Sequence, residues 1–96
     1  MAKMTESDVR SALDRAAQWS QTGESIQRTL KFKNFLESMA FVNAIAAKAE
    51  KVNHHPDILI RYNKVTLTLS THDAGGLTRK DFDLAAIIDG MVPATA

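Results

Sequence analysis

The stretch DILIRYNKVTLTLSTH, residues 57–72, contains the clearest regular pattern in the chain. Residues 57–62 are rich in β-forming side chains, and over residues 65–72 aliphatic side chains alternate with polar ones. Alternation of period two is typical of a strand with one buried face. Between the two runs, Asn63-Lys64 predicts a tight hairpin turn that lacks the usual glycine. The stretch therefore predicts two antiparallel strands, with His72 on the polar face of the second.

The segments before this hairpin predict a helix, a short pair of strands and a second helix. Thr5 precedes acidic residues as a helix N-cap does, and apolar side chains then recur at helical spacing up to Ala17. Turn-forming residues 22–24 follow, and residues 26–32 alternate imperfectly, as in a half-buried strand.

After the hairpin, residues 73–76 predict a loop. Thr78, followed three residues later by Asp81, predicts the capped start of a last helix, and Gly90 marks its end. The complete order is helix, two strands, long helix, two strands, helix. We therefore predict an α+β fold in a single domain over residues 1–96: a four-stranded antiparallel sheet with helices packed on one face.

The long central helix, expected from Asn34 as N-cap to about Lys51, is apolar around most of its circumference. One apolar stripe consists of Phe35, Met39, Val42, Ala46 and Ala49. Further apolar residues widen it well beyond a single face: Leu36, Ala40, Phe41, Ala44, Ile45 and Ala47. A helix that is apolar on several sides is buried on several sides, which in so small a domain favours a contact between copies of the chain. The alternative is that its alanines serve only as good helix formers.

Composition limits the functions open to the chain. A formal net charge of +1 gives no long-range field, so direct binding of nucleic acid or of a membrane surface is not indicated. The chain has no cysteine, which rules out a disulfide, a thiolate zinc site and a cysteine nucleophile. The sequence has no signal-peptide core and no run of about 20 apolar residues. We therefore expect a cytoplasmic protein.

The chain's three histidines are the side chains best suited to chemistry. His54 and His55 precede Pro56, between the long helix and the hairpin, and His72 lies at the end of the hairpin. Imidazoles titrate near neutral pH and can therefore both donate and accept protons. The residues alone leave three interpretations open: an acid–base site beside the sheet, a metal site, or structural roles at a helix exit. Adjacent residues of an extended chain point to opposite sides, which disfavours a metal bound by both His54 and His55.

Three further side chains are ambiguous. Asp81 is explained by helix capping alone. Glu50 lies in the last turn of the long helix, where an acidic group opposes the helix dipole, and it either orients His54 or is simply solvated. Trp19, the only tryptophan, either fills the core or an interface, or borders a pocket for a flat ligand.

The spacing of these residues resembles the signature of pterin-4a-carbinolamine dehydratases. The shared pattern is Glu50-x-x-x-His54-His55-Pro56, followed by five residues to Tyr62, nine to His72 and eight to Asp81. The resemblance extends from about Trp19 to about Asp89, whereas residues 1–15 match poorly. Asn53 stands where an acidic residue is common in the family.

The resemblance implies a hydro-lyase that acts on 4a-hydroxytetrahydropterin, which aromatic amino acid hydroxylases leave behind when they use tetrahydrobiopterin or a related pterin. Loss of water gives quinonoid dihydropterin and supports recycling of the tetrahydropterin. The resemblance implies no metal and no redox cofactor. An acid must protonate the C4a hydroxyl while a base removes the proton from N5, and imidazoles can do both, each step contributing about 10²–10⁴-fold.

On this resemblance, His54 and His72 are expected to be the acid–base pair, and His55 is expected to bind and orient the pterin. Which imidazole is the acid and which is the base stays open. Asp81 is expected to fix a tautomer or to contact the pocket, as well as to cap its helix. Ser70 and Thr71 would offer backbone groups to the pyrimidine edge of the pterin, and Trp19 would border its ring. Glu50 would be a supporting carboxylate.

The resemblance also implies an assembly, a homodimer or a homotetramer. Some family members act in addition as dimerisation cofactors for a homeodomain transcription factor, through the helical face that otherwise builds their own tetramer. The apolar helix over residues 35–51 suits either use. The intact set of histidines favours the enzyme, because an interaction module has no need of it; binding of a pterin without turnover is a third interpretation.

Overall fold

The computed structural model describes residues 2–93. Its elements are α1 (Glu6–Arg15), β1 (Ser20–Thr22), β2 (Ser25–Lys31), α2 (Phe35–Val52), β3 (Asp57–Arg61), β4 (Lys64–Leu69), a 3-10 turn η1 (His72–Ala74) and α3 (Arg79–Met91). The strands form one antiparallel sheet in the order β1-β2-β4-β3. Both the predicted class, α+β, and the predicted order of helices and strands are confirmed.

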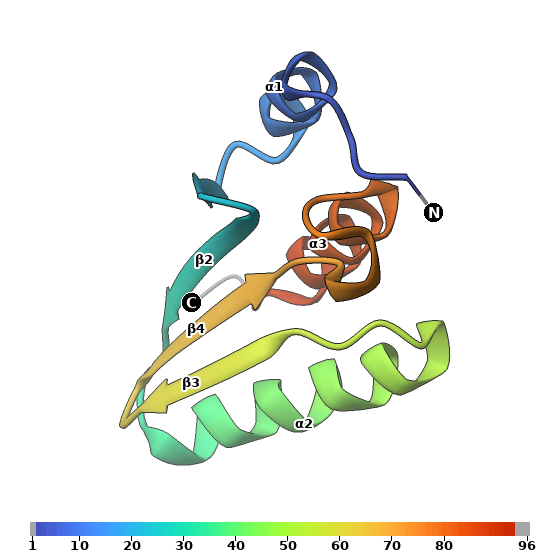
Figure 1. Ribbon diagram of the computed structural model, residues 1–96. Coiled ribbons are helices and arrows are strands. Elements are labelled where there is room, and N and C mark those ends of the chain that lie inside the picture. Colours follow the sequence, from blue (N-terminus) through green and yellow to red (C-terminus); the bar gives the residue numbers. More distant parts are fainter. Residues whose placement is uncertain (1, 94–96) are drawn as a thin grey trace.

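The sheet has one apolar face and one polar face, as the alternation of β4 requires. Val65, Leu67 and Leu69 of β4 are buried in the core, which also takes side chains from β2 and from all three helices. On the opposite face, the hydroxyls of Thr29 and Thr66 form a cross-strand hydrogen bond of 2.9 Å. In Figure 1, α2 runs alongside β3 and β4, and α1 lies at the other end of the molecule.

The hairpin differs from its prediction at its turn and at the end of its second strand. Arg61 pairs with Lys64, so the turn residues are Tyr62 and Asn63, one position earlier than expected. Tyr62 adopts a left-handed conformation with φ of 55°, which the two-residue turn needs and which glycine usually supplies. Strand β4 ends at Leu69, so the expectation that the strand continues to His72 is wrong.

Helix α2 begins as predicted, because the Asn34 side chain accepts a hydrogen bond of 2.9 Å from the amide of Glu37. Its buried stripe is different from the predicted one and consists of Ser38, Phe41, Ile45 and Ala49. Of the predicted stripe only Ala49 is buried; Phe35 is 48% exposed, and its neighbour Leu36 is 78% exposed. One face of the helix is therefore packed into the core, and within residues 2–93 part of its apolar surface has no cover.

Trp19 is part of the core. It is buried, and its indole N–H donates a hydrogen bond of 2.8 Å to Asp89 of α3. Arg28 of β2 forms an ion pair with the same carboxylate. This contact joins the chain after α1 to the last turns of α3, and the partly buried carboxylate has a cationic partner, as such groups require. No helix within residues 2–93 is long and apolar enough to cross a bilayer.

Candidate functional site

The end of α2 sets the position of the adjacent histidines. Asn53 ends the helix in the left-handed conformation, with φ of 53°, a role that asparagine fills more readily than most residues. The amide of Asn53 then donates to the Glu50 carbonyl (3.3 Å), and the amide of His54 donates to the Ala49 carbonyl (3.1 Å). These two bonds make a Schellman motif. The backbone of His54 is therefore held as the last hydrogen-bonded unit of the helix.

The start of α3 supplies a fully buried carboxylate. Asp81 lies three residues after the N-cap Thr78, and its Oδ2 accepts a hydrogen bond of 2.9 Å from the Thr78 amide. Asp81 has no solvent exposure at all. The predicted capping role is confirmed.

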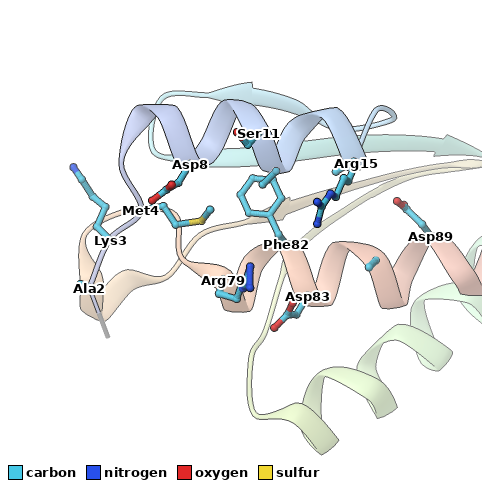
Figure 2. Close-up of a pocket in the computed structure, with 13 residues that line it drawn as sticks. Ala2, Lys3, Met4, Asp8, Ser11, Arg15, Arg79, Phe82, Asp83 and Asp89 are labelled. Carbon is cyan, nitrogen blue, oxygen red and sulfur yellow. The ribbon is translucent and has the colours of Figure 1, made fainter.

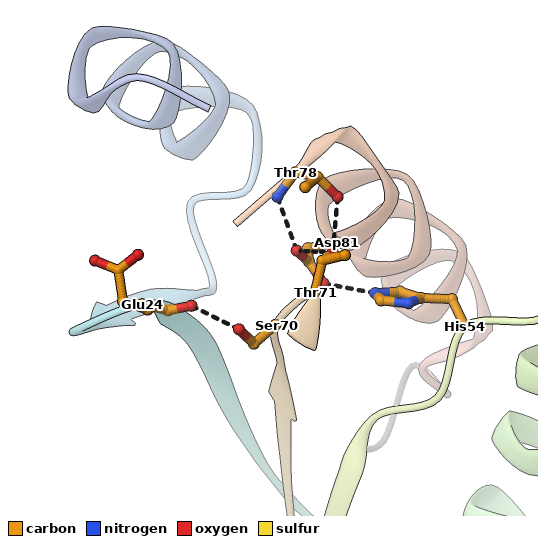
Figure 3. Close-up of polar contacts among 6 residues, drawn as sticks. All are labelled: Glu24, His54, Ser70, Thr71, Thr78 and Asp81. Carbon is orange, nitrogen blue, oxygen red and sulfur yellow. Dashed lines mark hydrogen bonds and ion pairs between the residues drawn. The ribbon is translucent and has the colours of Figure 1, made fainter. Parts of the chain in front are cut away.

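The same carboxylate contacts a histidine from the other end of the fold. The distance from His54 Nε2 to Asp81 Oδ1 is 2.6 Å, and the His54 side chain is only 12% exposed. The Thr71 hydroxyl donates to Asp81 Oδ2 at 2.8 Å and lies 2.7 Å from the Thr78 hydroxyl. Figure 3 shows these side chains converging from three segments: the chain after α2, the chain after β4 and the start of α3. The result is a His–Asp pair fixed by two threonines.

His55 has a different carboxylate partner. Its Nε2 contacts Glu50, and both side chains are more than half exposed. The expectation that Glu50 orients His54 is wrong: Glu50 contacts His55, while His54 contacts Asp81. An exposed ion pair of this kind contributes little to stability, so its effect is mainly to orient His55.

His72 opens the 3-10 turn η1 and is exposed. The turn ends at Gly75, whose φ of 74° is left-handed, and this agrees with the loop predicted there. Thr71, immediately before His72, forms an isolated bridge with Gly76. Thr71 therefore connects the chain segment of His72 to the buried carboxylate that holds His54.

The backbone of Thr71 was expected to contact the substrate, but its groups have partners within the chain. Its amide donates to the Gly76 carbonyl (3.0 Å), and its carbonyl accepts from the amides of Gly76 (3.3 Å) and Ala74 (3.1 Å). The Ser70 hydroxyl donates to the Glu24 carbonyl (2.8 Å), as Figure 3 also shows. Within this segment, the side chain of Thr71 is the group that contacts the His–Asp pair.

A separate cavity of about 820 Å³ lies between α1 and α3 (Figure 2). Phe82, Met4, Arg15, Arg79 and Asp83 are among its lining residues, and no histidine is. The histidines, which are the side chains expected to transfer protons, all lie outside this cavity, so they define the candidate site instead. Within residues 2–93, no three histidine, aspartate or glutamate side chains are grouped so that they could hold a metal ion.

The two threonine hydroxyls are the part of the site that the sequence did not reveal. The sequence predicted a backbone role for Thr71 and only a cap for Thr78. The spacing Thr78-x-x-Asp81 indicated that these residues are neighbours, but nothing local indicates that Thr71 joins them. That contact depends on where β4 ends and on the bridge to Gly76.

Comparisons with known proteins agree on one family. The family model described as "Pterin 4 alpha carbinolamine dehydratase" matches residues 2–91. A protein of Picosynechococcus sp. is 52% identical over 89 residues, which are 93% of this chain and 97% of the relative. One of Acidobacterium capsulatum is 49% identical over 92 residues, 96% of this chain and 100% of the relative. Both relatives bear the name "Putative pterin-4-alpha-carbinolamine dehydratase".

Solved structures give the same result. The crystal structure of a transcriptional coactivator/pterin dehydratase from Brucella melitensis superposes with a TM-score of 0.90 at 34% identity, covering 95% of this chain and 99% of that one. A pterin dehydratase-like protein described as a RuBisCO assembly factor in the alpha-carboxysome has a TM-score of 0.66 at 25% identity, covering 77% and 88%.

Proposed function

The chain belongs to the pterin 4 alpha carbinolamine dehydratase family, and from this membership we propose that it removes water from 4a-hydroxytetrahydropterin to give quinonoid dihydropterin. The observation that carries the proposal is the contact of 2.6 Å between His54 and the buried Asp81. A carboxylate in this position orients an imidazole for proton transfer, the task that this dehydration requires.

The proposed chemistry uses all three imidazoles. One histidine takes the proton from N5 of the pterin, and the electrons of that bond form the N5=C4a double bond. A second histidine protonates the C4a hydroxyl, which leaves as water. We assign these two roles to His54 and His72, and we assign to His55, held by Glu50, the binding and orientation of the pterin.

The experiment that tests the proposal measures the dehydration rate of freshly generated 4a-hydroxytetrahydropterin by ultraviolet absorbance, with chelator-treated wild-type protein. We expect acceleration above the spontaneous rate that persists after chelation. A folded protein that leaves the spontaneous rate unchanged would contradict the proposal. Activity that disappears with chelation and returns with added metal would contradict the role of the histidines as direct acid and base.

We propose in addition that the chain forms a homodimer or homotetramer through the apolar surface of α2. Phe35 and Leu36 are exposed at the start of the helix, and Val52 is 42% exposed at its end. Exposed apolar side chains gathered on one element mark a contact surface. The Brucella protein is described as a coactivator as well as a dehydratase, so the alternative occupant of this surface is a transcription factor.

Leu36→Asp should lower the native mass of the protein by at least half, because a carboxylate cannot be buried in an apolar contact without a partner. Leu36 is 78% exposed in the isolated chain, so the fold itself should tolerate the change. Size exclusion with light scattering measures the mass, and Ser7→Asp, which adds the same charge to the exposed side of α1, is the matched control.

An unchanged mass of a folded Leu36→Asp protein would show that this surface is not the contact. Phe41, another apolar residue of the same helix, is unsuitable as a test position. It is buried against Phe32, with ring centroids 5.0 Å apart, so its replacement would disturb the core.

A further inference from the structure

We infer that Thr71 and Thr78 are positioning residues, whose hydroxyls act with Asp81 to keep a proton on Nε2 of His54 and so make Nδ1 the atom that accepts a proton from the substrate. The inference rests on the proposed function and identifies His54 as the base. It follows from the direction of each hydrogen bond around Asp81.

We place the hydroxyl protons by counting the donors. Thr71 donates to Asp81 Oδ2 at 2.8 Å, which uses its only proton. The contact of 2.7 Å between the two threonine hydroxyls must therefore be donated by Thr78. The Thr78 amide also donates to Oδ2, at 2.9 Å. The Thr78 hydroxyl thus donates to the Thr71 hydroxyl, which in turn donates to the carboxylate.

The hydrogen bonds around Asp81 use both of its oxygens. Oδ2 accepts two hydrogen bonds, from the Thr71 hydroxyl and the Thr78 amide. Oδ1 lies 2.6 Å from His54 Nε2, and one proton must lie between these two atoms. We place this proton on the imidazole, so that His54 Nε2 is the donor and Asp81 accepts three hydrogen bonds.

A neutral imidazole with its proton on Nε2 has an unprotonated Nδ1. Within residues 2–93, Nδ1 of His54 has no hydrogen-bond partner, and no buried side-chain nitrogen or oxygen of this part of the chain lacks one. Nδ1 is therefore on the accessible side of the ring. It can take the N5 proton of the pterin, and the imidazolium that forms is stabilised by the carboxylate already bonded to Nε2.

The arrangement also assigns different roles to two of the histidines. Since His54 begins the reaction as a proton acceptor, the proton delivered to the C4a hydroxyl comes from another group, which we assign to His72. Thr71 is adjacent to His72 in the chain and bonded to Asp81, so one residue connects the segments that carry the base and the acid. Proton balance is complete: N5 loses one proton to His54, and water leaves with one from His72.

Two side-chain changes at Thr71 test the inference. Thr71→Val keeps the shape but removes the hydroxyl, and Thr71→Ser keeps the hydroxyl. We expect Thr71→Val to lower kcat about 10-fold with KM unchanged, and Thr71→Ser to stay within about two-fold of wild type. Without the Thr71 hydroxyl, Asp81 loses one hydrogen-bond donor and is less well positioned to orient the His54 imidazole. The exposed surface that meets the pterin is unaltered.

Nitrogen NMR of the 15N-labelled full chain gives a second measurement that does not depend on activity. At a pH where His54 is neutral, its Nε2 should carry the proton in the wild type, and Thr71→Val should show a mixture of both tautomers. The His54→Ala spectrum assigns the signals. The wild-type spectrum alone is decisive even if Thr71→Val unfolds, because a proton on Nδ1 would overturn the inference.

The other outcomes are equally distinct. Equal kcat for wild type and folded Thr71→Val would overturn the positioning role, and so would a loss in Thr71→Ser as large as that in Thr71→Val. A wild-type protein with the Nε2 tautomer but no dehydratase activity would contradict the proposed function, while it would support the hydrogen-bond directions around Asp81.

Discussion

His54→Ala should lower kcat for dehydration of 4a-hydroxytetrahydropterin by about 10²–10⁴-fold, the usual contribution of one acid–base group. The reason is specific to this site. Within residues 2–93, His54 is the one histidine bonded to a fully buried carboxylate, so no other imidazole there is oriented in this way. The product also forms spontaneously, and the measurement is therefore the enzymatic excess over the spontaneous rate in stopped-flow absorbance.

The control for this prediction is Lys51→Ala. Lys51 is exposed in the last turn of the same helix, so its removal disturbs the helix end without touching the His–Asp pair. It should retain wild-type kcat. If His54→Ala keeps full activity, or if it loses activity only because it no longer folds by circular dichroism, the residue is structural and the catalytic assignment fails.

Asp81→Asn should lower kcat by about 10²–10³-fold with the fold retained, because the amide reverses the direction of one hydrogen bond. An asparagine carbonyl can replace Oδ2 and accept from Thr71 and Thr78. Its NH₂ group then faces His54 Nε2, where it can only donate. The imidazole must carry its proton on Nδ1, and the base is blocked by its own hydrogen.

Asp83→Asn is the matched control for this second change, since Asp83 loses the same charge two residues further along α3 and is exposed. It should leave kcat at the wild-type value. Activity of Asp81→Asn close to wild type would show that the carboxylate only caps the helix, the interpretation that its position in the sequence supports by itself.

Local signals in the sequence were sufficient for most of the fold. The caps at Thr5, Asn34 and Thr78 each begin a helix in the structure, because capping depends on residues within one turn. The period-two pattern of β4 likewise determined which of its side chains are buried. The buried stripe of α2 was misjudged because the helix is apolar on several sides, and only the packed sheet decides which side faces inward.

The site was harder to predict because its central contact is long-range. His54 and Asp81 are separated by 27 positions, whereas Glu50 is close in the sequence. The position of Glu50 in the last turn of the helix suggested that it either orients His54 or is solvated, but the left-handed conformation of Asn53 ends the helix one residue before His54. The histidines were selected by the chemistry of imidazole, and the family resemblance added Asp81 to them. The pairing of His54 with Asp81 and of His55 with Glu50 became known only from the three-dimensional arrangement.

The Schellman motif at the end of α2 connects the proposed site to local unfolding. The amide of His54 forms the last hydrogen bond of this helix, and terminal turns open at a lower free energy than the whole domain does. Opening of this turn would release the backbone that positions the imidazole next to Asp81. On heating, the protein should therefore lose activity at a lower temperature than the one at which the whole domain unfolds. Hydrogen exchange at the His54 amide measures how often this turn opens. Substitutions that stabilise the last turn of α2 should therefore be the first to raise the temperature at which activity is lost.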